Sequence, residues 1–100
     1  MSWKWVPVET DSTTVEEIMA DDNGEVIAKI TKPGTNRWYG TFYKDQAYTY
    51  KVIDGSVERA RWEMTNYIYN ACDKAVSEFC YIRDHLPDCL ELMKAIKRKM

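Results

Sequence analysis

The chain has 100 residues, of which 45% are hydrophobic and 30% charged, and these values favour one globular domain with a modest core. Aromatic residues make up 13% of the chain, which argues against intrinsic disorder. The formal net charge of −2 lacks the positive excess that is typical of general nucleic-acid binding. We therefore expect a single domain over residues 1–100.

The start of the chain and its cysteines favour a cytoplasmic protein. Met1-Ser2-Trp3-Lys4 opens no apolar signal peptide, and no run reaches the roughly 18–20 apolar residues of a membrane span. The odd set of three cysteines, Cys72, Cys80 and Cys89, suits reduced thiols. We expect no membrane association, and we expect Cys72 and Cys80 to be buried structural residues.

The first 55 residues predict an antiparallel sheet. Trp3–Val6 alternates like a short edge strand. The sequence of Thr13–Ala20 is compatible with two secondary structures, a strand and a helix. Its position before the hairpin turn Asp22-Asn23-Gly24 favours a strand, whereas its composition and the capping-box spacing of Thr13 and Glu16 favour a helix.

Three further strands are predicted over residues 25–32, 37–43 and 47–53, separated by short turns. Alternation places Val26, Ala28 and Ile30 on one face of the first strand and Ile27 on the other. It places Trp38, Gly40 and Phe42 on one face of the second, and Tyr48, Tyr50 and Val52 opposite Thr49 and Lys51 on the third. If these faces meet a helix, the opposite, open face carries the remaining positions of the strands, which are Lys29, Thr31, Arg37, Tyr39, Thr41, Tyr43, Thr49 and Lys51. The sheet is expected to have three to four strands.

The second half predicts helices. Ser56 is a good N-cap, and apolar residues then recur at helical spacing, namely Val57, Ala60, Met64, Tyr67, Ile68, Ala71, Ala75 and Phe79. We expect one long helix of about 25 residues within 56–83 that covers one face of the sheet. A short C-terminal helix over 86–100 should follow Pro87. The expected fold class is α+β.

Catalytic and metal-binding patterns are weak. His85 lies between Cys80 and Cys89, but the spacing is irregular for zinc and a fourth ligand is missing, so we interpret His85 as exposed in an interhelical turn. A Cys–His nucleophilic pair would lack an orienting group. Neighbouring carboxylates, such as Glu16 beside Glu17, are expected to form exposed acidic surface. We predict no enzymatic activity, no cofactor and no metal.

Charge and aromatic residues indicate binding surfaces. Seven acidic residues and no basic one lie between Glu9 and Glu25, whereas residues 94–99 hold four basic residues. Tyrosine and arginine on an open sheet face are typical of protein interfaces. The candidate partner-binding residues are Glu16, Glu17, Asp21, Asp22, Glu25, Arg37, Tyr39 and Tyr43.

Several segments resemble small phage-encoded proteins that have a strand meander, a tryptophan on the middle strand and a following helix. These segments are Trp3-Lys4-Trp5, residues 22–28, Arg37-Trp38-Tyr39-Gly40 and residues 56–60. Several proteins of this form are accessory or anti-defence proteins, including anti-CRISPR inhibitors. The resemblance covers roughly residues 13–75 and transfers no functional residue. It implies a non-catalytic viral inhibitor in the host cytoplasm that binds and blocks a bacterial defence or other host complex.

A sheet followed by a helix is also similar to the arm-site DNA-binding domains of phage integrases, whose sheet enters the major groove. Only Lys29, Arg37 and Lys51 are basic on the expected sheet face. The alternative function is therefore a nucleic-acid-binding module that uses this face together with the basic cluster at 94–99. The predicted long helix is apolar on two sides, one for the sheet and one for the C-terminal helix or a partner. The sequence is therefore compatible with either a monomer or a homodimer.

Overall fold

The computed structural model describes residues 2–11, 13–34, 37–44, 50–74 and 79–98. The elements are five strands and three helices, β1 (Lys4–Val8), β2 (Thr14–Ala20), β3 (Val26–Pro33), β4 (Arg37–Phe42), β5 (Tyr50–Asp54), α1 (Val57–Lys74), α2 (Cys80–Arg83) and α3 (Cys89–Arg98). All neighbouring strands pair antiparallel, in the order β1-β2-β3-β4-β5. The α+β prediction is confirmed, with five strands rather than three or four.

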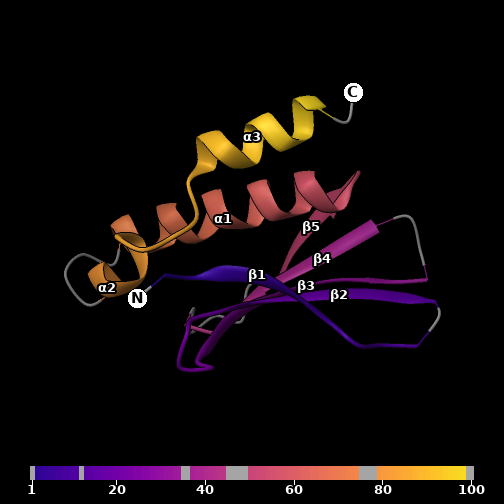
Figure 1. Ribbon diagram of the computed structural model, residues 1–100, viewed down its shortest axis with the longest axis horizontal. Helices are drawn as coiled ribbons and strands as arrows, with labels where there is room; N and C mark the ends of the chain where they lie inside the picture. Colours follow the sequence, from indigo (N-terminus) through magenta and orange to yellow (C-terminus); the bar gives the residue numbers. More distant parts are fainter. Residues whose placement is uncertain (1, 12, 35–36, 45–49, 75–78, 99–100) are drawn as a thin grey trace.

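The elements form three layers (Figure 1). Helix α1 lies across one face of the sheet, and α3 packs on the outer side of α1. Short helix α2 lies at one end of the molecule, beside the N-terminus. The three helices lie on the same side of the sheet, so no described part of the chain covers its other face.

Residues 14–20 form a strand, so the helical alternative for this segment is wrong. The strand pairs with β1 on one side and with β3 on the other, and this pairing outweighs the local helix propensity of its Glu-Glu-Ile-Met-Ala sequence. The turn into β3 is the predicted hairpin. Gly24 adopts a φ of +84°, and the Asp21 backbone N–H donates to the Glu25 carbonyl at 3.1 Å.

A β-bulge changes the expected alternation in β3. Met19 lies opposite Ala28 and Ala20 lies opposite Val26, so Ile27 is an extra residue in the ladder. The prediction that Ile27 lies on the face opposite to Ala28 and Ile30 is wrong, because Ile27 is fully buried in the core with them. Val26, which was expected to share their face, is exposed.

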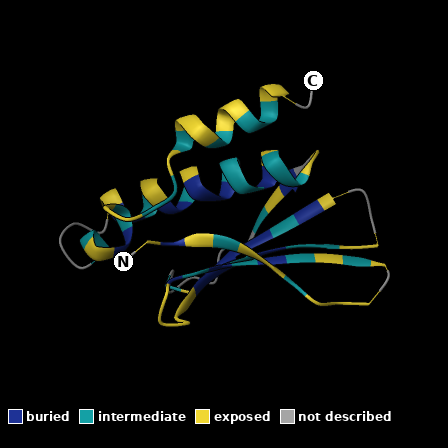
Figure 2. Cartoon of the chain, viewed as in Figure 1, coloured by how far each residue is buried: buried dark blue, intermediate teal, exposed yellow. Residues whose placement is uncertain are grey.

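The core fills the space between α1 and the sheet (Figure 2). Trp38 and Phe42 of β4 are buried there, as predicted. Gly40 lies between them, and a Cβ atom at this position would stand 2.4 Å from Met64 Sδ. Glycine at the centre of β4 therefore allows α1 to approach the sheet closely.

The predicted long helix is found as two helices, and its predicted residue Ala75 lies outside the described residues. Ser56 begins the first as predicted, because Ser56 Oγ accepts from the Arg59 backbone N–H at 3.3 Å, but α1 ends at Lys74 and α2 begins at Cys80. An unbroken helix over 57–83 would be about 40 Å long, as long as the 39 Å longest extent of the molecule. The separate α2 instead brings the fully buried Ile82 back to the core.

Helix α3 forms the outermost layer, and its residues are less buried than those of α1 and the sheet. Asp88 caps it, since Asp88 Oδ1 accepts from the Leu90 backbone N–H at 2.9 Å. None of its described residues is fully buried, and Leu90 is 63% exposed. The helix packs on α1 rather than on the sheet.

Candidate interaction surfaces

The sheet face opposite α1 is a candidate interaction surface, and we call it the uncovered face. Strand register places residues from all five strands on it. Its described members are Lys4, Val6, Val8, Thr14, Glu16, Ile18, Ala20, Val26, Lys29, Thr31, Pro33, Arg37, Tyr39, Thr41 and Val52. Of these, Thr41 is buried, at 5% exposure.

Two apolar groups on the uncovered face flank a polar strand. Val6 and Ile18 lie directly opposite each other on β1 and β2, and Tyr39 lies opposite Val52 on β4 and β5. Val6 is 43% exposed and Val52 is 52% exposed. Lys29 of β3 lies between the two groups. The sequence prediction did not include Val6 or Ile18 on this face, although their alternate positions carried the signal. For Val52 the predicted face was wrong, because the prediction placed Val52 opposite Thr49 and Lys51 and these two on the open face, whereas the register pairs Val52 with Tyr39.

The predicted aromatic and basic residues fall partly on this face. Arg37 is exposed and Tyr39 is half-buried on β4, whereas Tyr43 is 43% exposed in the turn just after that strand. The prediction for Lys51 is wrong, because the register places it on the same face as Ile53, toward α1. Its ammonium lies 6.0 Å from the centre of the Tyr67 ring. Thr49 lies outside the described residues.

Glu17 is not part of an exposed acidic surface, contrary to expectation. It lies on the helix-facing side of β2, is 4% exposed, and accepts from Arg61 Nε at 2.7 Å. A second bond from Arg61 Nη2 makes the pair bidentate. The bonds to Glu17 raise the pKa of the Arg61 guanidinium above its ordinary value. Glu17 therefore ties β2 to α1 and does not face a partner.

Asp21 is also buried, at 9% exposure, so its expected exposure is wrong as well. Its Oδ1 accepts from the backbone N–H groups of Asn23 at 3.0 Å and Glu25 at 2.9 Å. These bonds satisfy the backbone of the hairpin turn, as aspartate commonly does. The carboxylate is therefore a structural element of the β2–β3 turn.

The other predicted acidic residues do not form one patch. Glu16 is half-buried on the uncovered face, while Asp22 and Glu25 are exposed at the β2–β3 turn. Glu25 pairs with Lys44 at 3.5 Å. Only Asp22 and Glu25 therefore lie together and accessible as the sequence predicted.

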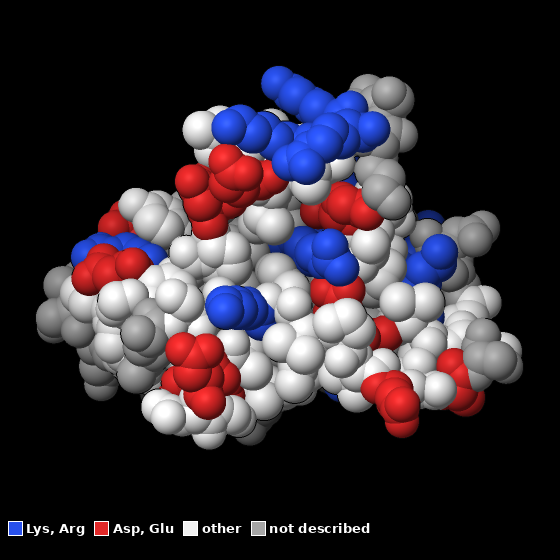
Figure 3. Space-filling view, viewed as in Figure 1, with Lys and Arg blue, Asp and Glu red and all other residues white. Residues whose placement is uncertain are grey.

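The basic residues of α3 lie far from the uncovered face. Figure 3 shows Lys and Arg side chains gathered over α3, whereas acidic side chains form separate small groups over the rest of this view. The described members of this basic cluster are Lys94, Lys97 and Arg98. Because α3 is the layer farthest from the sheet, the two surfaces point to opposite sides of the molecule.

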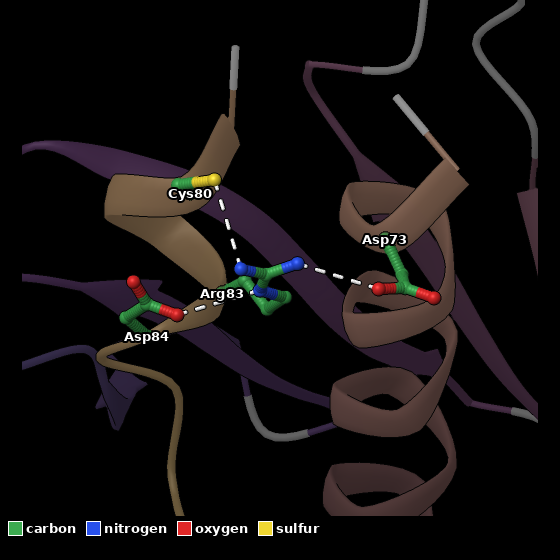
Figure 4. A network of polar contacts seen from close by, with 4 residues as sticks. All are labelled: Asp73, Cys80, Arg83 and Asp84. Atoms are coloured by element: carbon green, nitrogen blue, oxygen red, sulfur yellow. Dashed lines mark hydrogen bonds and ion pairs between the residues drawn. The ribbon is translucent and has the colours of Figure 1, made fainter. Parts of the chain in front are cut away.

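The cysteines and His85 occupy distinct environments. Cys72 is buried, as predicted, and burial raises the pKa of its thiol to about 11. Cys80 is only half-buried, with Arg83 Nη2 at 3.7 Å from its sulfur, and Arg83 also contacts Asp73 and Asp84 (Figure 4). These contacts join α2 to the end of α1. His85 is exposed in the turn after α2, as predicted.

The described ranges of the chain contain no group of three or more His, Cys, Asp or Glu side chains placed to hold a metal ion. Among the same residues, no helix has the length and apolar character needed to cross a membrane. Comparisons with protein-family models, with curated proteins and with solved structures found no match to this chain.

Proposed function

We propose that this protein is a non-catalytic inhibitor that docks its uncovered face on a functional surface of a bacterial defence complex and blocks it. The observation that carries the proposal is an exposed sheet face on which aliphatic residues and Tyr39 stand uncovered. A sheet with one face on the core and one toward water normally alternates apolar and polar residues. Val6, Ile18 and Val52 depart from that pattern, with Val6 and Val52 exposed and Ile18 half-buried.

The composition of this face suits a protein partner. Tyrosine and arginine, present as Tyr39 and Arg37, are enriched at the energetic centres of protein interfaces. Mixed apolar and polar residues are ordinary for non-obligate interfaces. Glu16 and Lys29 supply charges of both signs, which would set the orientation of the complex.

Nucleic-acid binding has less support. The uncovered face has three described basic residues, Lys4, Lys29 and Arg37, and Lys51 lies on the other side of the sheet. Each neutralised phosphate adds to the affinity, so few cations give weak binding at physiological salt. The basic cluster on α3 faces the opposite side, so one bound duplex would not use both surfaces as the alternative function requires.

The target class follows from the resemblance to phage anti-defence proteins, and the mechanism would be steric. The exposed carboxylates of Asp22 and Glu25 lie at the end of the β2–β3 hairpin, where they would add an electrostatic contribution against basic residues of the target. Glu17 and Asp21 are excluded from this role by their burial.

The test is phage plaquing on bacterial strains whose CRISPR systems target the phage. Expression of the wild-type chain should restore plaques on at least one strain. Val52→Lys should abolish the effect, because it places a charge in one of the two apolar groups of the uncovered face, which we expect to weaken binding by about tenfold or more. Leu90→Lys is the matched control, since it makes the same kind of change at an exposed aliphatic residue on α3.

Three results would contradict the proposal. The first is that no strain regains plaques. The second is that Leu90→Lys abolishes the activity while Val52→Lys preserves it. The third is that the purified chain gives a salt-sensitive mobility shift with DNA, and that Lys29→Glu removes this shift. The last result would favour the nucleic-acid alternative.

A further inference from the structure

A pocket of about 450 Å³ lies at the start of β1, and most of its lining residues come from the helix side of the sheet. It is formed where the start of β1 meets α1, the α2–α3 connection and α3, and its walls include Trp3, Trp5, Leu86 and Leu92. Small-molecule pockets typically have volumes of about 300–1,000 Å³. The pocket therefore has the size and the apolar walls of a ligand site.

The walls of this pocket are held in place before any ligand binds. The Trp3 backbone N–H donates to the His85 carbonyl at 3.0 Å and ties β1 to the α2–α3 connection. Trp5 Nε1–H donates to Thr65 Oγ1 at 3.0 Å, and Arg61 is fixed by its bidentate bonds to Glu17. A pre-organised site loses little conformational freedom when it binds.

The two formally charged side chains in the lining, Lys4 and Arg61, are both basic. Lys4, Arg61 and His85 line it, and no aspartate or glutamate does so among the described residues. The bonds to Glu17 use Nε and Nη2 of Arg61, and a guanidinium has five N–H groups, so donors remain for a further acceptor. The Nε1–H of Trp3 is buried and has no acceptor among the described residues.

We propose that this pocket binds a small aromatic monoanion, such as an aryl carboxylate. The flat ring would pack against the indoles and leucines, where aromatic contacts are favourable. The carboxylate would accept charge-assisted hydrogen bonds from the cationic lining. Of the lining residues, only Lys4 also belongs to the uncovered face, and the ligand proposed here does not depend on the proposed inhibitory function.

The test uses three probes of the same shape and different charge, namely phenylacetate, phenylacetamide and phenethylamine. The indole N–H signals of the four tryptophans are followed by two-dimensional NMR on the full chain. Phenylacetate should shift the Trp3 and Trp5 signals saturably, with a Kd on the order of 1 mM. The amide and the amine should bind at least about tenfold more weakly, because they lack the anion. Trp38, whose Nε1–H donates to the Gly55 carbonyl at 2.9 Å, serves as the internal reference.

Paired charge variants test which cations act. Lys4→Glu with His85→Glu should weaken phenylacetate binding by about tenfold, since both residues line the pocket. Lys94→Glu with Lys97→Glu makes at least as large a change in net charge on α3, outside the lining, and should leave the affinity within about twofold. Leu92→Trp should block the pocket by filling it.

The proposal is overturned by any of three results. The first is that phenylacetate produces no saturable shift of the Trp3 or Trp5 signals. The second is that the three probes bind with equal affinity. The third is that the two paired charge variants weaken phenylacetate binding to the same extent. A folded spectrum for each variant ensures that a loss of binding is not a loss of structure.

Discussion

The two faces of the sheet differ in what covers them, although both are built from the same alternating strands. Glu17 of β2 points toward α1, is 4% exposed and is locked to Arg61, whereas its neighbour Glu16 lies on the uncovered face and is half-buried. Ile30 is fully buried beneath α1, whereas Ile18 on the adjacent strand remains partly accessible. One face therefore supplies most of the described core, and the other is not covered by a described helix.

The largest contrast should come from matched truncations of isoleucine. Ile30→Ala removes a fully buried side chain and should lower the free energy of unfolding by about 2–5 kcal/mol. Ile18→Ala on the uncovered face should lower it by about 1 kcal/mol or less. Chemical denaturation of both variants measures the difference. If Ile30→Ala does not fold, Ile30→Val should still cost more than Ile18→Val, and equal losses at the two sites would refute the comparison.

The next contrast concerns the two neighbouring glutamates of β2. Glu17→Ala leaves Arg61 without its carboxylate partner, and the expected loss is about 2 kcal/mol, because the Arg61 side chain still reaches solvent at 29% exposure. Glu16→Ala should change stability by about 0.5 kcal/mol or less. A double-mutant cycle with Arg61→Ala isolates the pair. Additive effects of the two substitutions would show that the ion pair contributes nothing.

Thiol labelling should sharpen the same comparison. Because burial raises the pKa of Cys72 to about 11, its thiolate fraction at pH 8 should be about 100-fold lower than that of a thiol with the ordinary value of 9.0. Val52→Cys places a thiol on the uncovered face as the reference, and peptide mass spectrometry after iodoacetamide treatment reports both rates. If Cys72 were labelled as fast as the thiol introduced by this substitution, its burial would be contradicted.

The raised pKa of Cys72 also sets a sign for the pH dependence of stability. The folded state holds the neutral thiol, so its contribution is complete below pH 9 and is lost as the pH rises from 9 toward 11. Cys72→Ala should flatten this part of the pH profile relative to the wild type. Circular dichroism during denaturation at pH 8 and pH 10 checks the change.

The smallest effect is expected at Asp11, in the exposed turn before β2. Hydrogen bonds from the Thr13 hydroxyl and from the backbone of Thr13 and Thr14 lower the pKa of Asp11 below its ordinary value of 3.8. A lowered folded-state pKa stabilises the fold above that ordinary value, and the contribution is lost as the pH falls below it. Asp11→Asn should therefore be slightly less stable at pH 7, and the difference from the wild type should shrink in acid. A constant difference from pH 7 to pH 2 would contradict this account.

Local patterns in the sequence were sufficient for the hairpin at Asn23-Gly24, the Ser56 cap, and the burial of Trp38 and Phe42. The φ of Gly24, the cap bond of Ser56 and the alternation in β4 depend on residues close together in the chain. Turn chemistry and side-chain period act over a few residues, so they can be read without the fold. These features also predicted the α+β class, although not the number of strands.

Long-range contacts decided the remainder. The local sequence of β2 is compatible with a helix or a strand, and its pairing with β1 and β3 determines that it is a strand. The local sequence also predicts an exposed Glu17, whereas its hydrogen bond with Arg61 of α1 depends on the packing of α1 on the sheet. The bulge at Ile27 reverses the alternation that the sequence implied, and Lys51 takes the side of the sheet that its register with Gly40 dictates. Which face stays uncovered likewise depends on where α1 packs. Burial and ion pairing arise between residues distant in the chain, so the tertiary structure alone determined which of the predicted residues are exposed and which are buried.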